Sequence, residues 1–269
     1  MSNLTIGQKL HFVLRLAVAM CFIGHGAFGI ITKPIWVNYF AVFGIGKVMA
    51  YRLMPILGSF DILLGLIMLI KPIRGIALWL VIWGLITATL RPLSGEPFAE
   101  LIERTGNFGA PLALLILSGG VWTGFKNLFK TLDPTIDPDK ETLKKITSAL
   151  RIIVFLLLAG HGWLNLIGKK GLMSQYTYLG LHNPVLTGKI AGIFEITMAA
   201  LLLIKPLRPV ILALLIWKIA TELFYPHYEV FEWIERGGSY CCLLALWLVT
   251  NKTAYQRIYA VKPKAKATA

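Results

Sequence analysis

The sequence contains the same pattern of residues twice. Ile23–Phe28 reads IGHGAF and Ala159–Leu164 reads AGHGWL, and an arginine, Arg15 or Arg151, stands ten residues before each histidine. The match continues along the chain at a nearly constant spacing, pairing Asp61 with Glu195, Trp83 with Trp217, and Glu103-Arg104 with Glu235-Arg236. A repeated block of roughly 130 residues indicates that one domain has been duplicated, so the fold has to be built twice.

Long apolar runs fill both copies. Hydrophobic residues make up 57% of the chain and charged residues 15%, and such a composition is far more apolar than that of a soluble domain. Runs long enough to span about 30 Å of hydrocarbon predict an all-α integral membrane protein with eight transmembrane helices. These runs lie near 10–32, 53–70, 73–90, 108–125, 148–167, 187–204, 207–225 and 238–251.

The domain organisation follows from this count. We expect a four-helix repeat at 1–128, a cytoplasmic linker at 129–147, a second four-helix repeat at 148–252 and a basic tail at 253–269. Four spans per copy is an even number, so both copies enter the membrane in the same orientation. Parallel repeats of this kind are related by a pseudo-twofold axis along the membrane normal.

The charges predict the topology. Lysines and arginines gather in the second-to-third and sixth-to-seventh connections, in the linker and in the tail, so the positive-inside rule places these segments and both termini in the cytoplasm. The net charge of +14 comes mostly from these segments, where anionic lipid headgroups account for it. A nucleic-acid partner is therefore not expected.

Ionisable residues inside the spans are the candidate site. His25 and Asp61 are expected at similar depth in the outer half of the bilayer, counting 1.5 Å per residue, and His161 with Glu195 repeats the arrangement. A His–carboxylate pair can move protons or support a ligand. Alternatively, each histidine only donates a hydrogen bond where its flanking glycines bring two helices together.

The third helix of each copy adds further candidates. The first copy carries Trp83, Thr87 and Arg91 along one face, whereas the second carries Trp217 with Lys218 and Glu222. The last two residues either neutralise each other or form a charged site specific to the second copy. Three further residues, at the entry to the fourth helix of each copy, are candidates for ligand binding: Arg104, Asn107 and Arg236. Asn107 is also expected to cap the fourth helix.

Each copy resembles the DoxX family of four-helix bacterial membrane proteins, which includes DoxD and MauE-like members. The resemblance rests on the early arginine, on FIGHGAFG at 22–29 and LAGHGWLN at 158–165, and on the lysine that follows, Lys33 or Lys169. It also rests on Asp61 or Glu195 before a small-and-leucine run, although glutamate is commoner at the first position. The resemblance implies a bacterial cytoplasmic membrane protein that acts with quinones or with soluble partner subunits.

Two hypotheses of different classes follow. In the first, the protein is the membrane subunit of a quinone-linked redox system, with His25, Asp61, His161 and Glu195 handling protons. A haem held by His25 and His161 across the pseudo-twofold is a less favoured variant of it. In the second, the protein is a non-enzymatic carrier or an assembly subunit of a larger complex. The sequence has no recognisable nucleophile, phosphate loop or metal cluster, and no metal site is expected.

Overall fold

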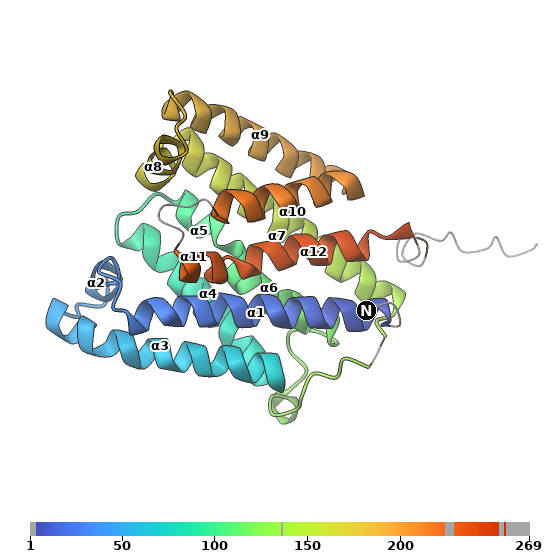
Figure 1. The fold of residues 1–269 in the computed structure, drawn as a ribbon. Coiled ribbons are helices and arrows are strands. Elements are labelled where there is room, and N and C mark those ends of the chain that lie inside the picture. Colours follow the sequence, from blue (N-terminus) through green and yellow to red (C-terminus); the bar gives the residue numbers. More distant parts are fainter. Residues whose placement is uncertain (1–3, 136, 224–228, 253–255, 257–269) are drawn as a thin grey trace, which may run out of the picture.

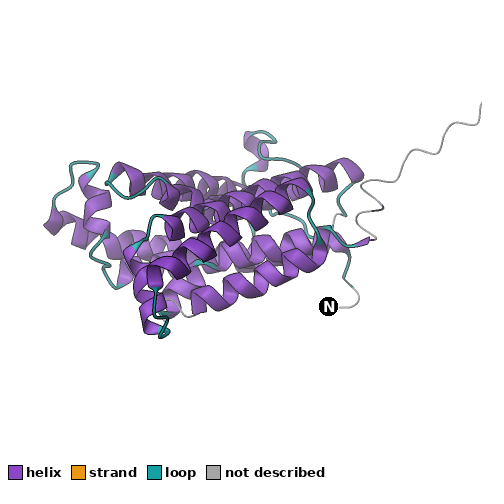
Figure 2. Ribbon diagram, turned by 90° about the horizontal axis from the view of Figure 1, so that it is seen from above, coloured by secondary structure: helices purple, strands orange, loops and turns teal. Residues whose placement is uncertain are grey.

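The computed structural model describes residues 4–135, 137–223, 229–252 and 256, and within these ranges every regular element is a helix (Figure 2). The first copy contains α1 (Ile6–Ile30), α2 (Trp36–Ala41), α3 (Lys47–Ile70), α4 (Arg74–Leu93), α5 (Ala99–Glu103) and α6 (Thr105–Leu117). A short 3-10 turn, η1 (Phe125–Asn127), precedes the second copy. The second copy contains α7 (Lys140–Leu166), α8 (Lys170–Tyr178), α9 (Pro184–Ile204), α10 (Arg208–Leu223), α11 (Val230–Glu235) and α12 (Gly237–Val249).

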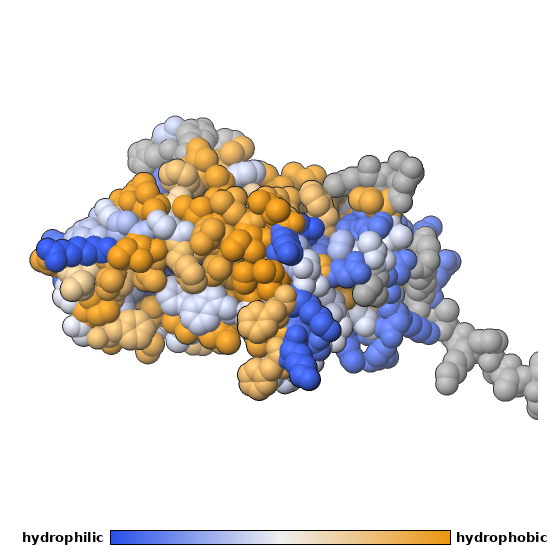
Figure 3. Space-filling view, turned by 90° about the horizontal axis from the view of Figure 1, so that it is seen from below, coloured by the Kyte–Doolittle hydropathy of each residue, from blue (hydrophilic) through white to orange (hydrophobic). Residues whose placement is uncertain are grey.

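Five of the described helices, α1, α3, α4, α7 and α9, are long and apolar enough to cross a membrane. The other three expected spans are shorter: α10 has 16 residues, and α6 and α12 have 13 each. The expected run 108–125 ends early, because α6 stops at Leu117 and is followed by two glycines with positive φ, Gly119 and Gly120. Figure 3 shows apolar residues across the middle of the face that α3 forms, with polar residues gathered towards one end.

The central helices of the bundle belong to both copies. Helices α1, α6, α7 and α12 pack on one another and share one hydrophobic core, which includes Leu14, Leu114, Leu150 and Leu243 (Figure 1). Helix α3 packs on α1 at one side of this core, and α9 packs on α7 at the other. The short helices α2 and α8 lie at the same end of the bundle, opposite the N-terminus. The two copies are therefore joined along their central helices, not merely tethered in sequence.

The repeated arginines hold helix ends. The guanidinium of Arg15 donates to the carbonyls of Met68, Leu69 and Ile70 at the end of α3, and Arg151 donates to Leu203 and Ile204 at the end of α9. These carbonyls have no partner within their own helix, so a cation near them satisfies orphan acceptors and complements the helix dipole. The early arginine of each copy thus has a structural role.

The segment between the copies differs from the expected linker. Helix α7 begins at Lys140, within 129–147, because the side chain of Asp139 accepts a hydrogen bond from the Thr142 amide and caps the helix. The residues before it are attached to the first copy, where Gly75 N–H donates to Leu128 and Leu132 N–H donates to Pro72. The expected basic tail 253–269 lies outside the described residues except for Gln256.

The glycines beside each histidine allow three helices to meet, α1 with α3 and α11 in the first copy and α7 with α5 and α9 in the second. A Cβ placed on Gly24 would lie 2.7 Å from Glu235 Cα in α11, and one on Gly160 would lie 2.6 Å from Glu103 Cα in α5. The second glycine of each motif approaches its own copy instead, since a Cβ on Gly162 would lie 2.8 Å from the Gly192 carbonyl in α9. Helix α11 of the second copy is therefore packed on α1, and α5 of the first copy is packed on α7.

Candidate functional site

Both His–carboxylate pairs form. His25 Nδ1 lies 2.8 Å from Asp61 Oδ2, and His161 Nδ1 lies 2.6 Å from Glu195 Oε2. Both carboxylates are buried, Asp61 being 1% exposed and Glu195 fully buried. The pairing agrees with the equal depths expected from the sequence, because α1 and α3 run in opposite directions and bring the two positions level. A carboxylate at Nδ1 fixes the proton on that nitrogen and leaves Nε2 as the acceptor of each ring.

The two pairs differ in what else the carboxylate binds. Trp217 Nε1 donates to Glu195 Oε1 at 2.9 Å, so both oxygens of the second carboxylate are occupied. In the first copy, Asp61 Oδ1 and Trp83 Nε1 are buried without a hydrogen-bond partner among the described residues. The aspartate is one methylene shorter than the glutamate, which gives a physical reason why it does not reach the indole. Buried polar atoms of this kind normally have a partner, so the first copy has unused hydrogen-bonding capacity.

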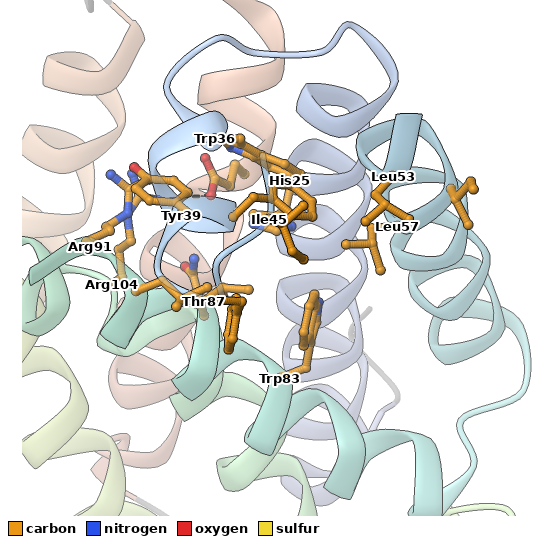
Figure 4. A pocket seen from close by; sticks show the side chains of 16 residues that line it. His25, Trp36, Tyr39, Ile45, Leu53, Leu57, Trp83, Thr87, Arg91 and Arg104 are labelled. Carbon is orange, nitrogen blue, oxygen red and sulfur yellow. Dashed lines mark hydrogen bonds and ion pairs between the residues drawn. The ribbon is translucent and has the colours of Figure 1, made fainter. Parts of the chain in front are cut away.

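A mostly apolar cavity of about 280 Å³ lies beside the first pair (Figure 4). Figure 4 shows Tyr39, Arg91 and Arg104 on one side of it and Leu53 and Leu57 on the opposite side. His25, Trp83, Thr87 and Asn107 also line it. With Arg91 and Arg104, the cavity therefore brings together six residues that the sequence analysis singled out. The ring of His25 packs against that of Trp36 in a tilted arrangement, with centroids 4.7 Å apart and an interplanar angle of 32°.

One wall of this cavity comes from the other copy. Glu235 of α11 lines the cavity and accepts a hydrogen bond from Arg104 at 2.9 Å. Asn107 also lines it, but the expectation that Asn107 caps the fourth helix is wrong. Helix α6 begins two residues earlier, at Thr105, and no side chain caps it. The site of the first copy is therefore completed by the second.

The charged residues specific to the second copy pair with each other. Lys218 Nζ lies 2.5 Å from Glu222 Oε1, and Arg236 Nε lies 3.7 Å from Glu222 Oε2. All three side chains are at most 5% exposed. Of the two alternatives left open by the sequence, mutual neutralisation matches this geometry. In the same copy, the Tyr176 hydroxyl donates to the side-chain oxygen of Asn165 at 2.6 Å, and the Asn165 side-chain amide donates to the His161 carbonyl.

A reciprocal set of ion pairs joins the copies. Arg104 pairs with Glu235 and Arg236 with Glu103, so each arginine binds the carboxylate of the opposite copy. The lysines after the first helices repeat the exchange, with Lys33 2.9 Å from Glu232 and Lys169 2.6 Å from Glu100. The sequence shows these residues only as repeated charges, because the partners of Arg104 and Arg236 lie 131 and 133 residues away and that of Lys33 lies 199 residues away, so the fold alone brings them close.

The acid sensitivity of these pairs can be predicted at Glu100, which lies in α5 outside the spanning helices. Burial alone would raise the pKa of Glu100, but Lys169, Arg91 and Arg104 together lower it to about 2. A lowered pKa means that the carboxylate contributes its full stability above the unfolded value of about 4.3 and loses it as the pH falls towards the folded value.

We therefore expect the thermal midpoint of the detergent-solubilised protein to fall between about pH 4 and the folded pKa of about 2. Glu100→Gln should flatten this fall, because no proton is then taken up at that position. Glu141→Gln, at an exposed position of α7, should retain the wild-type profile. An unchanged slope in Glu100→Gln would contradict the assignment.

Tyr39 was not predicted from the sequence as a residue of the site. Its hydroxyl donates to Glu96, and the residue forms part of the cavity wall. Trp36, in the connection after the first helix that could be expected to roof the bundle, packs against His25. Both lie on α2, a six-residue helix whose sequence gives no signal beyond its aromatic content. Among the described residues, Cys21, Cys241 and Cys242 are buried and form no disulfide.

Comparison of the chain with protein-family models, with curated proteins and with solved structures gives no match. The resemblance to DoxX-like proteins thus stays a prediction based on the motifs quoted above.

Proposed function

We propose that the protein binds a quinone-like ligand in the first-copy cavity and serves as the membrane subunit of a quinone-linked redox system. The observation that carries the proposal is the mostly apolar cavity lined by His25, a histidine whose Nδ1 is bound by the Asp61 carboxylate. A planar head group with carbonyl or hydroxyl oxygens needs such an enclosure, with a few polar groups to orient it.

The cavity opens towards the region that lipid tails would occupy. Phe43 and Ile56 line it and are 61% and 64% exposed, so its apolar side is continuous with the outer surface of the helices. A ligand dissolved in the membrane could enter there without crossing water. Arg91, Arg104 and Asn107 also line the cavity; the two guanidiniums pair with Glu96, Glu100 and Glu235, and their remaining N–H groups can donate to a head-group oxygen.

His25 supplies the proton chemistry. Because Asp61 holds Nδ1, the free Nε2 can accept a proton from a ligand hydroxyl or return it to a ligand oxygen. Trp83 also lines the cavity, and its buried Nε1 has no hydrogen-bond partner among the described residues, which makes it a candidate donor once a ligand is bound. In the second copy Glu195 already accepts from Trp217, so we assign ligand binding to the first copy.

The membrane arrangement proposed with this function is eight spans in two parallel repeats, with both termini in the cytoplasm of a bacterial cell. The order of long and short helices is the same in α1–α6 and α7–α12, and the cross-copy ion pairs occur in matched sets. The helix ends that carry Lys71, Arg74, Lys205 and Arg208 fit the cytoplasmic side by the positive-inside rule. The end bearing α2 and α8 would then face outward.

Ligand binding is tested first on the purified protein. Organic extraction with mass spectrometry should recover a quinone in stoichiometric amount, and the ultraviolet–visible spectrum would reveal haem instead. Titration with a soluble ubiquinone or menaquinone analogue then gives a Kd. His25→Gln should weaken binding by about tenfold, the loss expected when one hydrogen bond of about 1–1.5 kcal/mol is removed.

The duplication provides the control. His161→Gln changes the matched position of the second copy and should leave the Kd unchanged, as should Trp217→Phe. Equal losses in His25→Gln and His161→Gln would contradict binding at the first copy alone. A protein that carries no quinone and does not bind the analogue would refute the proposal and favour a carrier or an assembly subunit.

A further inference from the structure

A second, polar cavity adjoins the ligand cavity. Its volume is about 370 Å³, and it is lined by charged residues of both copies, among them Lys33, Glu96, Lys169, Glu229 and Glu232. We call it the vestibule. It lies between the copies, under the end of the bundle that carries α2, and its charges are mutually paired rather than free for a ligand.

The vestibule and the ligand cavity share part of their lining. Five residues border both: Trp36, Tyr39, Arg91, Arg104 and Glu235. Two of the five, Trp36 and Tyr39, belong to α2, so residues of this short helix line both spaces. Trp36 lines the vestibule and packs against the ring of His25, so a single aromatic side chain lies between the vestibule and the histidine.

The vestibule is open at its far side. The side chains of Lys33 and Glu229 are 32% and 48% exposed and lie 4.0 Å apart at its rim. The ligand cavity, in contrast, has its exposed lining at the apolar residues Phe43 and Ile56. One space thus opens among charges and the other among hydrocarbon side chains.

The two openings would admit different species, one a lipid-soluble molecule and the other water and protons. An apolar mouth admits a lipid-soluble molecule but gives a proton no hydrogen-bonded path, because charge transfer into hydrocarbon is costly. A cavity lined by ionised groups holds water, and water relays protons. A histidine that exchanges protons with a ligand has to exchange them with bulk solvent in each cycle, which the apolar mouth alone does not permit.

We infer that the ligand cavity has a second, aqueous entrance through the vestibule, by which water and protons reach His25 from the face that carries α2. Tyr39 controls this entrance. Its hydroxyl donates to Glu96, and the Arg91 guanidinium, which pairs with Glu96 at 3.1 Å, lies 5.5 Å from its ring. Together these contacts fix the phenol as part of the shared wall.

The use of this route by protons rests on the proposed function, but the entrance itself is tested without any ligand. Thr87 lines the ligand cavity and does not border the vestibule. The native cysteines are buried, so Thr87→Cys provides a reporter of access. A membrane-impermeant, charged thiol reagent is applied to sealed vesicles of known orientation, and modification is followed by mass spectrometry.

We expect Thr87→Cys to react with the charged reagent only from the α2 face. Adding Tyr39→Ala should raise the rate by about tenfold, because the wall is then opened. Ala88→Cys, at a position 1% exposed on the same helix, is the control and should stay unmodified.

Two results would overturn the inference. The first is modification of Thr87→Cys by a lipid-soluble maleimide but not by the charged reagent, which would leave the apolar mouth as the way in. The second is a charged-reagent rate that Tyr39→Ala does not change. Because no quinone is present in this assay, either result is distinct from a failure of quinone binding.

Discussion

Replacing Arg236 with methionine is expected to lower the free energy of unfolding by about 3–5 kcal/mol, the range found when one partner of a buried ion pair is removed. The guanidinium is 4% exposed and binds Glu103 of the opposite copy. It also lies 3.3 Å from Glu232 and 3.7 Å from Glu222. The substitution leaves these buried carboxylates with fewer cations, at a position where water cannot replace the arginine. Unfolding of the detergent-solubilised protein in increasing SDS measures the effect.

Two variants separate this effect from a general loss of charge. Lys33→Met also removes a cross-copy cation, but the lysine side chain is 32% exposed, so a cost of at most about 1 kcal/mol is expected. Combining Arg236→Met with Glu103→Gln should recover part of the loss, since one uncompensated charge is then removed. Similar costs for Arg236→Met and Lys33→Met would show that the buried arginine does not hold the copies together.

Substitution of alanine for Gly24 is expected to force the two copies apart. The added Cβ would lie 2.7 Å from Glu235 Cα and 2.8 Å from the Phe231 carbonyl, both of them backbone atoms of α11. Backbone atoms cannot rotate away as a side chain can, so α1 and α11 have to separate. Overpacking of this kind costs about 1–3 kcal/mol and occasionally more. The same SDS unfolding measurement applies.

Two other glycines serve as comparisons: the equivalent glycine of the second copy and a glycine with open space around it. Gly160→Ala meets Glu103 of α5 in the same way and should be destabilising to a similar degree. Gly46→Ala should cost at most about 1 kcal/mol, because none of the described atoms lies within 4 Å of the added Cβ and only the preference for glycine at the N-cap of α3 is lost. A Gly24→Ala protein as stable as Gly46→Ala would rule out the close approach of α1 and α11.

The parts of the fold that depend on one helix or on neighbouring helices were predictable. Hydropathy located the long helices, and depth counting placed His25 level with Asp61 and His161 level with Glu195. Such arguments need only the helical rise and the direction of each span. They fail at short helices such as α2, where six residues give too little periodicity to recognise.

The cross-copy contacts could not be predicted, because they depend on how two bundles dock. Glu235 and Glu103 are equivalent in sequence, and nothing local shows that each pairs with the arginine of the other copy. The difference between the copies was visible as Asp61 against Glu195. Its consequence, an indole without a partner beside a cavity in one copy and a bonded indole in the other, requires the positions of Trp83 and Trp217.

Helices α5 and α11 each pack on the opposite copy, so a residue encoded in one half of the chain can lie in the site of the other half. Glu235 is encoded in the second half of the chain, yet it lines the cavity beside His25, in the first half. For the ligand binding proposed above, a genetic screen is therefore expected to find loss-of-binding alleles in both halves of the gene. The two halves would then contribute to that binding as one unit.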